Sequence, residues 1–293
     1  MELIRTVDAM QAHADTARAD GRTLALVPTL GALHDGHLAL VRTALEAADH
    51  VTVSVFVNPT QFGPNEDYDD YPRDLEGDRE KLEALGVDAL FAPSVEEMYP
   101  YVDDAALPGP LAWVSVERLD EHLCGAYREG HFRGVTTVVT KLFNACKPDI
   151  GVFGTKDAQQ YVILRRLVEA LLFDIEIVGV PTVREPDGLA QSSRNDYLDS
   201  DERDQATVLY EAVTVAEEAI DGGEQEAQAV VRAMENALAA APEADVQYAE
   251  VVDAHTLQPM EYLAPGQEIL AAVAVFFGDT RLIDSTFVQV PRS

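Results

Sequence analysis

Short apolar runs alternate with amphipathic stretches through roughly the first 180 residues. The runs are rich in valine, isoleucine and leucine and have few polar interruptions; they cover residues 24–28, 51–57, 87–92, 150–154 and 175–180. Such runs are typical of strands buried on both faces of a parallel sheet. Helical spacing predicts helices between them, at residues 37–48, 75–85 and 158–173. This alternation predicts an α/β domain with helices on both faces of the sheet.

The pattern changes after about residue 188. Helical spacing covers residues 200–220 and 224–240, and three apolar runs follow at 246–252, 268–276 and 281–288. The last two runs flank Gly278-Asp279-Thr280, which is a hairpin signal. Two helices followed by antiparallel strands predict a smaller α+β domain. We therefore expect two domains, residues 1–185 and 186–293.

Acidic residues dominate the charge of this chain. Asp and Glu number 52 against 21 Lys and Arg, which gives a formal net charge of −31. Because nucleic acids and anionic membranes bind proteins largely through neutralised phosphates, this surface disfavours both partners. The excess is spread along the whole chain, as in adaptation to high salt, where screening relieves self-repulsion. A mesophilic protein with an acidic composition is the alternative.

The sequence also contains little that points to a membrane or to export. No window approaches the roughly 18 apolar residues of a transmembrane helix. Glu2, Arg5 and Asp8 occupy the part of the chain where a signal peptide needs an apolar stretch. Cys124 and Cys146 form no metal-ligand pattern and are expected to be reduced. We expect a cytoplasmic protein.

The first chemical motif follows the first apolar run, from Pro28 to His37 (PTLGALHDGH). In an open α/β sheet, ligands lie beyond the carboxyl ends of strands, where backbone N–H groups and the helix dipole favour phosphate. His34 and His37 are three residues apart and can donate hydrogen bonds to phosphate oxygens. This is the HxGH arrangement of class I nucleotidyltransferases and aminoacyl-tRNA synthetases. Chance surface histidines remain open, as does zinc, for which no third ligand is apparent.

The second motif is Gly154-Thr155-Lys156-Asp157, at the next predicted strand-to-helix junction. A lysine at a helix N-terminus is unfavourable for the dipole unless an anion is present. The chain has only three other lysines, so Lys156 indicates a phosphate site, although a solvated loop lysine is the alternative. Gln160, one turn later, is expected to face the same crevice.

The third motif is Gln191-Ser192-Ser193-Arg194, after the last strand of the first domain. Two hydroxyls and a guanidinium on a loop can hold a triphosphate and move with it. The motif stands in the place of the mobile KMSKS loop of the same superfamily. An ordinary polar loop is the alternative.

Together these motifs make the chain resemble the pantoate–β-alanine ligase (pantothenate synthetase) family along nearly its whole length. The matching stretches are VPTLGALHDGHLALV, VSVFVNPTQFGPNEDYDDYPR, FAPSVEEMYP, LCGAYREGHFRGVTTVVTKLFN, FGTKDAQQ and QSSRNDYL. The FVNPTQFG segment, from Phe56 to Gly63, is absent from related cytidylyltransferases. The resemblance implies a Rossmann-like nucleotidyltransferase domain followed by a smaller α+β lid domain.

The resemblance also implies a reaction. Pantoate and ATP would form pantoyl adenylate and pyrophosphate, and β-alanine would then displace AMP to give pantothenate. Magnesium would accompany the nucleotide, and no residue of this chain is assigned as a metal ligand. A homodimer formed through the first domain is the expected assembly, with small molecules as the other partners.

Family knowledge assigns roles to residues that match its motifs. The catalytic assignments are His34, His37, Lys156, Ser192, Ser193 and Arg194. Residues expected to line the ATP site are Leu30, Gly31, Ala32, Leu33, His34, Asp35, Gly36, His37, Gly154, Thr155, Lys156, Asp157, Val183, Gln191, Ser192, Ser193 and Arg194. Gln61 and Gln160 would bind pantoate, and Gln61 would also contact β-alanine. Arg128, His131 and Arg133 match a segment near the pantoate pocket.

Three positions depart from the family pattern. Leu30 replaces a usual methionine, which conserves volume. Glu129 replaces a common proline and loosens that loop, and Gln191 replaces an apolar residue before Ser192. None of these changes removes a group that the chemistry needs.

Two rival functions stay open. One is a different nucleotidyltransferase, which the FVNPTQFG segment and the two glutamines disfavour. The other is a non-catalytic nucleotide-binding protein that kept the scaffold, which the intact histidines, Lys156 and Ser-Ser-Arg loop disfavour. An RNA-binding role is opposed by the net charge of −31.

Overall fold

The computed structural model describes residues 1–64, 66–100 and 109–292. Asn65, inside one of the family-like stretches, lies outside the described residues. The chain packs as two compact units. Unit 1 contains Met1–Glu117, Arg128–Gly154 and Ile163–Val180; unit 2 contains Arg118–Tyr127, Thr155–Val162 and Pro181–Ser293. Two short segments that precede residue 163, Arg118–Tyr127 and Thr155–Val162, therefore pack within unit 2.

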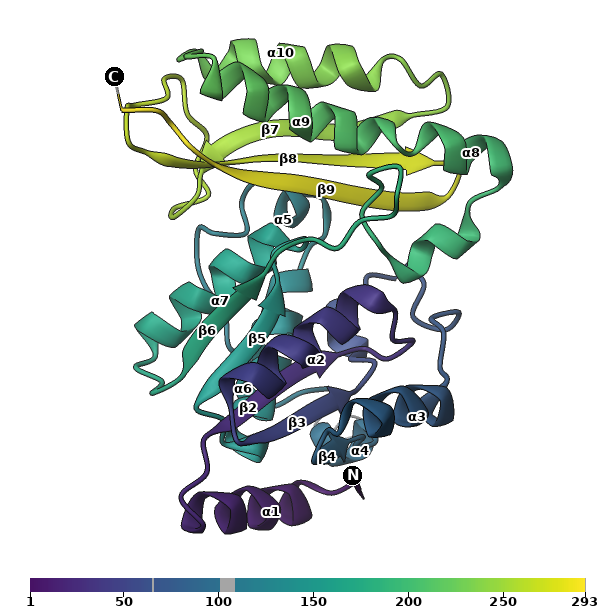
Figure 1. Ribbon diagram of the computed structural model, residues 1–293, viewed down its shortest axis with the longest axis vertical. Coiled ribbons are helices and arrows are strands. Elements are labelled where there is room, and N and C mark those ends of the chain that lie inside the picture. The colour runs from purple at the N-terminus through teal and green to yellow at the C-terminus, as the bar shows by residue number, and fades with distance from the viewer. Residues whose placement is uncertain (65, 101–108, 293) are drawn as a thin grey trace. The chain divides into compact units, whose positions relative to one another are not determined.

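Unit 1 is built on a six-stranded parallel sheet of order β1-β4-β3-β2-β5-β6 (Figure 1). The strands are β1 Glu2–Ile4, β2 Leu24–Thr29, β3 His50–Val55, β4 Ala89–Phe91, β5 Ile150–Gly154 and β6 Glu176–Val180. Strands β2 and β3 pair in register from Leu24 and His50 to Thr29 and Val55, so both end at the same edge. The predicted parallel α/β sheet is confirmed.

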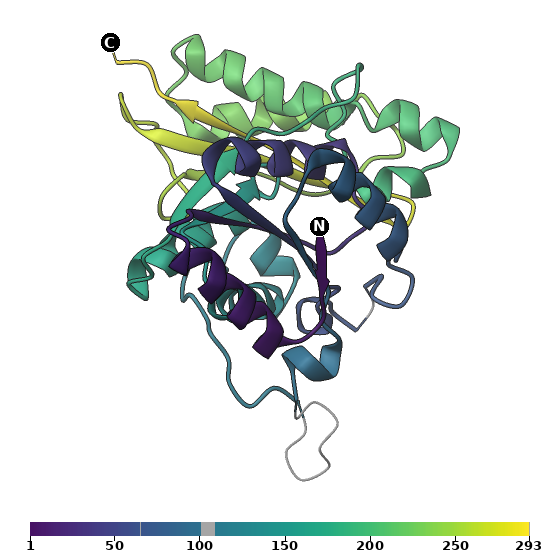
Figure 2. The same cartoon turned by 60° about the horizontal axis from the view of Figure 1, so that its bottom comes forward.

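Helices cover both faces of this sheet. They are α1 Val7–Ala19, α2 Asp35–Ala47, α3 Leu75–Leu85, α4 Val95–Met98, α6 His131–Cys146 and the later part of α7 Ala158–Ala170, with the 3-10 turn η1 Pro59–Gln61. Helix α2 packs across β2, β3 and β5, where Val41 and Ala44 meet Val27 and Val53 in a buried core. Leu24 and Leu26 alternate with those strand residues and point to the opposite face, and α1 and α6 contact β2 and each other (Figure 2).

Helix α6 is an element that the sequence pattern does not predict. Its middle, Gly134 to Thr140, is β-branched apart from the glycine and resembles a strand. The segment is helical because almost every residue from Phe132 to Val139 is buried against neighbouring elements, which overrides weak local propensity. Strand β1 and helix α1 are also additions to the predicted elements.

Unit 2 contains a three-stranded antiparallel sheet of order β7-β8-β9. Its elements are α5 Cys124–Tyr127, the first turn of α7, the 3-10 turn η2 Ser193–Tyr197, α8 Ser200–Gln205, α9 Val208–Asp221, α10 Ala227–Leu238, β7 Asp245–Asp253, β8 Glu268–Phe277 and β9 Thr280–Gln289. Phe277 pairs with Thr280 across Gly278 and Asp279, so the predicted hairpin is confirmed. Helices α9 and α10 pack together over one face of the sheet (Figure 1).

The helix predicted over residues 200–220 is two helices, so that prediction is wrong in detail. Helix α8 starts with a capping box between Asp199 and Glu202. The helix is interrupted at Ala206, which is fully buried. The hydroxyl of the next residue, Thr207, donates to the Asp204 carbonyl at 3.0 Å. A side chain that bonds to the preceding turn competes with helix continuation, and the helical spacing on either side conceals the break.

Candidate active site

The loop between β2 and α2 is held in shape by a buried carboxylate. Gly31 has φ +92°, and a β-carbon there would lie 2.9 Å from Val55 Cγ1 and 3.1 Å from Asp78 Oδ2. The amides of Ala32 and Leu33 donate to Asp78 Oδ2 and Oδ1 at 2.9 and 2.7 Å. Lys81 donates to the Leu33 carbonyl at 2.7 Å. The loop therefore has a fixed backbone before any ligand binds.

Asp78 is 1 % exposed, and burial raises the pKa of its carboxyl despite the two amide hydrogen bonds. The sequence pattern predicts backbone N–H groups near this junction that favour phosphate, but it does not show which of them are already bonded. The amides of Ala32 and Leu33 are already used inside the loop.

His34 and His37 form a capping box at the start of α2. His34 Nδ1 accepts from the Gly36 amide at 3.2 Å, and His37 Nδ1 accepts from the His34 amide at 3.4 Å. The two rings lie 4.1 Å apart between centroids. Because each Nδ1 accepts a backbone proton, the neutral form of each ring carries its own proton on Nε2. The remaining ring proton of each neutral histidine thus lies on Nε2, at the N-terminus of a helix, where anions are favoured.

Gln61, on turn η1, is oriented by a fully buried asparagine. Asn58 Nδ2 donates to Gln61 Oε1 at 3.1 Å and to the Gly134 carbonyl at 3.2 Å. Asn58 Oδ1 accepts from the Thr60 hydroxyl at 2.9 Å and from the Tyr99 hydroxyl at 2.8 Å. With its carbonyl oxygen committed to Asn58, Gln61 presents its amide nitrogen as a donor.

Helix α6 approaches η1 through Gly134. A β-carbon at that position would lie 2.6 Å from the Thr60 carbonyl carbon and 2.8 Å from Gln61 Cα, with the Thr60 oxygen closer still. Only glycine allows this backbone-to-backbone contact. The approach sets the position of Gln61 relative to α6.

His131 contacts the Gln61 turn directly, and Arg128 is linked to the turn through His131. His131 Nδ1 lies 2.8 Å from the Gln61 carbonyl oxygen, and its Nε2 lies 3.0 Å from Arg128 Nη1. Arg128 forms a two-pronged pair with Glu66 at 2.7 and 2.6 Å, and the guanidinium holds the pKa of that carboxyl below its usual range against the effect of burial. Arg133 instead places its guanidinium 4.3 Å from the centroid of the Trp113 ring.

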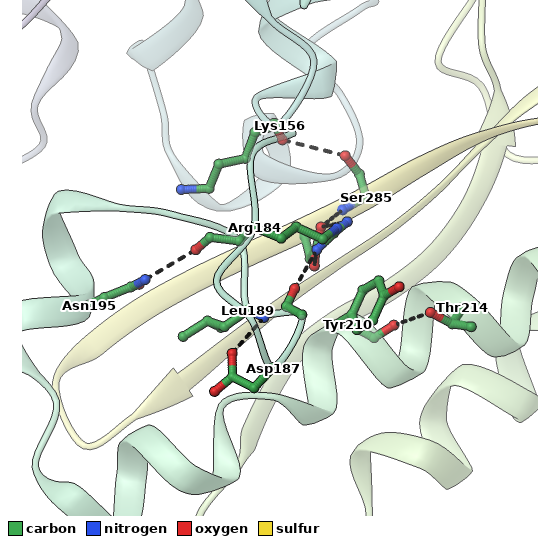
Figure 3. Close-up of polar contacts among 11 residues, drawn as sticks. Lys156, Arg184, Asp187, Leu189, Asn195, Tyr210, Thr214 and Ser285 are labelled. Atoms are coloured by element: carbon green, nitrogen blue, oxygen red, sulfur yellow. Dashed lines mark hydrogen bonds and ion pairs between the residues drawn. The ribbon is translucent and has the colours of Figure 1, made fainter. Parts of the chain in front are cut away.

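Lys156 lies in the turn between β5 and α7, within unit 2. Its carbonyl accepts from the Ser285 hydroxyl at 3.4 Å, and its side chain extends away from Ser285 (Figure 3). Burial lowers the pKa of the Lys156 ammonium, Asp157 and Asp284 oppose that shift, and Arg194 adds to it. A partly buried lysine near arginines is suited to an anion, which would relieve the repulsion.

The two adjacent glutamines of α7 have different surroundings. Gln159 is 4 % exposed and donates to the carbonyls of Leu119 and His122 at 2.9 and 2.8 Å, while accepting from the Gly125 amide at 3.3 Å. Gln159 therefore holds a neighbouring segment of unit 2 in place. Gln160 is partly exposed, unlike Gln159.

Residues 183–191 form a tight hairpin that leads into the Ser-Ser-Arg motif. Gln191 donates to the Val183 carbonyl at 2.9 Å, and Arg184 bridges Ala190 in the antiparallel sense. Ser192 then caps η2 by accepting from the Arg194 amide at 3.3 Å. The motif thus begins a 3-10 turn at the end of an ordered hairpin.

The expected site residues fall in both units. Unit 1 holds the residues of the first loop, Gln61 and Gly154; unit 2 holds Thr155, Lys156, Asp157, Gln160, Val183 and the Gln191–Arg194 motif. Within unit 1 the structure brings His34 and His37 together, and it brings Gln61 close to Arg128 and His131. Within unit 2, Lys156 lies within electrostatic range of Arg194.

Sequence reasoning missed the residues that hold these groups in place. Asp78 follows the helix cap Asp74 by four residues and looks like an ordinary first-turn acid. Asn58 and Tyr99 are 41 residues apart in the chain, yet their hydrogen bond is buried. Asn58 stands inside FVNPTQFG, so that segment was the one available signal.

A parallel sheet with a histidine pair capping the helix after a central strand defines the HxGH nucleotidyltransferase class of α/β proteins. The family model for Pantoate-beta-alanine ligase matches residues 2–287. This chain therefore belongs to the pantoate-beta-alanine ligase family.

Individual relatives agree over the full length. The chain is 86 % identical over 291 residues to the pantothenate synthetase of Salinibacter ruber, covering 99 % of both chains. It is similar to the crystal structure of pantothenate synthetase from Thermus thermophilus, with a TM-score of 0.88, 44 % identity and coverage of 99 % and 100 %. A pantoate-beta-alanine ligase from Francisella tularensis, complexed with beta-gamma ATP and beta-alanine, matches with a TM-score of 0.76, 32 % identity and coverage of 98 % and 97 %.

The described part of the chain has no helix long and apolar enough to cross a membrane. Within residues 1–64, 66–100 and 109–292, no three His, Cys, Asp or Glu side chains gather as a potential metal site.

Proposed function

We propose that this protein condenses (R)-pantoate with β-alanine at the expense of ATP, releasing AMP and pyrophosphate. The observation that carries the proposal is the family match across residues 2–287. The relative crystallised with an ATP compound and β-alanine supports the choice of those two substrates. The product, pantothenate, places the reaction in coenzyme A biosynthesis.

The reaction has two displacement steps. A pantoate carboxylate oxygen attacks the α-phosphorus of ATP, the bond to the β-phosphate oxygen breaks, and pyrophosphate leaves. The β-alanine nitrogen then attacks the acyl carbon of pantoyl adenylate; the bond to the AMP oxygen breaks and the amine loses a proton. Positioning and stabilisation of phosphate charge are the main tasks for the protein.

The histidine pair is assigned to the nucleotide. Their Nε2–H groups are donors held at the N-terminus of α2, and they would bind phosphate oxygens in the ground state and the transition state. Leu30 to Gly36 would line the same part of the ATP site, together with Gly154. The carboxylate of Asp78 supports this role because it fixes the loop from within.

Pantoate is assigned to Gln61 and Gln160, and β-alanine to Gln61. The Asn58 hydrogen bond supports the role of Gln61, since it occupies the carbonyl oxygen and leaves the amide nitrogen to act as a donor to a carboxylate or hydroxyl oxygen. His131, the first residue of α6, contacts the same turn, and Arg128 contacts His131.

Stabilisation of the remaining negative charge on the phosphates is assigned to residues of unit 2. Lys156, Ser192, Ser193 and Arg194 would stabilise the transferring α-phosphate and the pyrophosphate, while Thr155, Asp157, Val183 and Gln191 would complete the nucleotide site. Magnesium would enter with ATP. Because this ion usually keeps several waters and binds substrate phosphates, the proposal requires no dedicated protein cage.

The proposal extends to the organisation of the protein. Residues 1–185 would form the ATP- and pantoate-binding domain and residues 186–293 a lid domain. We propose a cytoplasmic homodimer formed through the first domain, with an acidic surface adapted to salt. Light scattering at several protein concentrations tests the dimer, and a constant monomer mass would contradict it.

Pyrophosphate release tests the function directly. The assay contains ATP, magnesium and pantoate, with and without β-alanine, in low and high potassium chloride. Release that needs pantoate, together with AMP and pantothenate that appear only with β-alanine, is the expected result. Pantoate-independent release with another acid would indicate a different nucleotidyltransferase. ATP binding without turnover in any salt would indicate a non-catalytic nucleotide-binding protein.

A further inference from the structure

A buried ion pair joins the hairpin of unit 2 to strand β9. Arg184 Nη1 and Nη2 donate to Asp284 Oδ2 and Oδ1 at 2.6 and 3.0 Å, so the guanidinium binds the carboxylate through both nitrogens. The Asp284 side chain is fully buried. The Arg184 guanidinium also lies 4.5 Å from the centroid of the Tyr210 ring. Two hydrogen bonds to one carboxylate and the stacking on an aromatic ring together fix the orientation of the guanidinium, whereas a flexible surface ion pair adopts several orientations.

On one side, this pair holds the hairpin of residues 183–191. Arg184 Nη1 also donates to the Gly188 carbonyl at 3.0 Å, so one side chain spans the hairpin it belongs to (Figure 3). Asn195 Nδ2 donates to the Ala190 carbonyl at 3.2 Å, and the Asn195 amide donates to the Ser192 carbonyl at 3.1 Å. The end of the hairpin and the start of the Ser-Ser-Arg turn are therefore one connected piece.

On the other side, the pair reaches Lys156. Ser285, next to Asp284 on β9, donates its amide to Asp284 Oδ1 at 2.8 Å. The Ser285 hydroxyl donates to the Lys156 carbonyl at 3.4 Å (Figure 3). One carboxylate is thus linked to Arg184 on the hairpin and, through Ser285, to the turn that carries Lys156.

We propose that Arg184 and Asp284 form a positioning pair. The pair holds Lys156 and the Ser192–Arg194 motif in the positions from which they bind the nucleotide phosphates. The inference rests on the proposed function and assigns two residues that do not themselves contact substrate. A merely structural ion pair is the alternative, and it would affect stability without a selective effect on the ATP half of the reaction.

The charges around Lys156 give the proposal an electrostatic signature. Four charged groups act on its ammonium: Asp157 at the start of α7, Asp284 on β9, Arg194 in η2 and Arg184 in the hairpin. The two carboxylates raise the pKa of Lys156, and the two guanidiniums and burial lower it. Removal of the Asp284 charge lowers that pKa further. The loss of activity at alkaline pH, where Lys156 gives up its proton, then begins at a lower pH.

Two variants separate geometry from charge. Asp284→Asn removes the charge and one acceptor, whereas Arg184→Lys keeps the charge and removes the two-pronged contact. We expect each to lower kcat for pantoate-dependent pyrophosphate release by between about tenfold and 100-fold, with KM for pantoate within about twofold. Only Asp284→Asn should move the alkaline limb of the pH profile to lower pH.

Asp187→Asn is the matched control. Asp187 belongs to the same hairpin and pairs with Arg203 at 2.8 Å, but its side chain is 44 % exposed. Exposed pairs contribute little, so kcat and the alkaline limb should stay as in the unaltered protein. Thermal melts establish that each variant is folded.

Two further readouts keep the outcomes distinct. If Asp284→Asn does not fold, the positioning pair is tested with Arg184→Lys and Ser285→Ala instead. We expect Ser285→Ala to lower kcat several-fold. Calorimetric titration with ATP alone needs no turnover, and the affinity should fall in Arg184→Lys but not in Asp187→Asn. An unaltered protein without pantoate-dependent turnover would overturn the proposed function alone. A folded Arg184→Lys with unchanged kcat and ATP affinity, or a folded Asp284→Asn with unchanged kcat and alkaline limb, would overturn the positioning pair.

Discussion

Replacing Gly134 by alanine tests how Gln61 is positioned. The added methyl group would meet the Thr60 carbonyl and Gln61 Cα at 2.8 Å or less, where ordinary contact begins at 3.4 Å. The three nearest atoms all belong to the backbone, so rotation of a side chain cannot relieve these contacts. Helix α6 and turn η1 must separate by roughly 1 Å to restore contact. The same movement stretches the 3.2 Å hydrogen bond from Asn58 to the Gly134 carbonyl.

The size of the effect follows from that displacement. Overpacking of a tight contact costs about 1–3 kcal/mol, which lowers the melting temperature by roughly 2–4 °C for each kcal/mol in a protein of this size class. A misplacement of about 1 Å at a substrate-positioning group costs on the order of 100-fold in rate. We therefore expect the activity loss to exceed what the loss of stability explains.

The assay is pantoate-dependent pyrophosphate release at a temperature well below the melt, with kcat and KM for pantoate measured separately. Gly63→Ala is the control, since a β-carbon there meets Glu66 no closer than 3.6 Å. We expect Gly134→Ala to lower kcat/KM for pantoate between about tenfold and 100-fold, and Gly63→Ala to change it less than about twofold. Gly134→Ala with unaltered activity and melting temperature would show that this contact does not set Gln61.

Three other predictions follow from charge. Lys156→Ala should lower the adenylation rate by at least about two orders of magnitude, and a rate within about tenfold of the unaltered protein would refute its role. Burial lowers the pKa of His50 from 6.5, aided by His13 and opposed by Asp88. Below pH 6.5, His50 therefore binds a proton more readily in the unfolded chain than in the folded chain. The free energy of unfolding should then fall as the pH falls, by up to about 1.4 kcal/mol per pH unit, until the pH drops below the lowered pKa of His50 in the folded protein. Denaturant titrations from pH 7.5 to 5 should show this slope reduced in His50→Gln, and equal slopes would contradict it. With a net charge of −31, the melting temperature should rise from low to high potassium chloride, and an equal or lower value would remove the salt-adaptation hypothesis.

Much of the fold could be read from hydrophobic periodicity. The strands at residues 24–29 and 150–154 and the helix at residues 75–85 lie within a residue of their predicted bounds. Those elements bury a continuous run or a regular stripe, so local pattern and tertiary environment agree. Helix α6 differs because its β-branched residues favour a strand, and only its burial on several sides makes it a helix.

The candidate site, like the fold, could be predicted only in part from the sequence. His34, His37, Lys156 and the Ser-Ser-Arg motif stand at junctions that the strand and helix pattern predicts, so the sequence alone indicated a phosphate site. Their detailed roles stay predictions. The sequence could not indicate that the amides of Ala32 and Leu33 are already bound to Asp78, which is about 45 residues away in the chain.

What the sequence determined by itself was the order of elements, the class of fold and the short motifs, because each depends on residues within one or two turns of each other. What only the tertiary structure decided was how those motifs are held. Asp78 beneath the first loop, Asn58 behind Gln61 and Asp284 against Arg184 are joined across 45, 3 and 100 residues of chain. The two long links depend on packing of separate elements. In all three the partner is buried, and a buried polar group must find its hydrogen bonds wherever the folded chain places them.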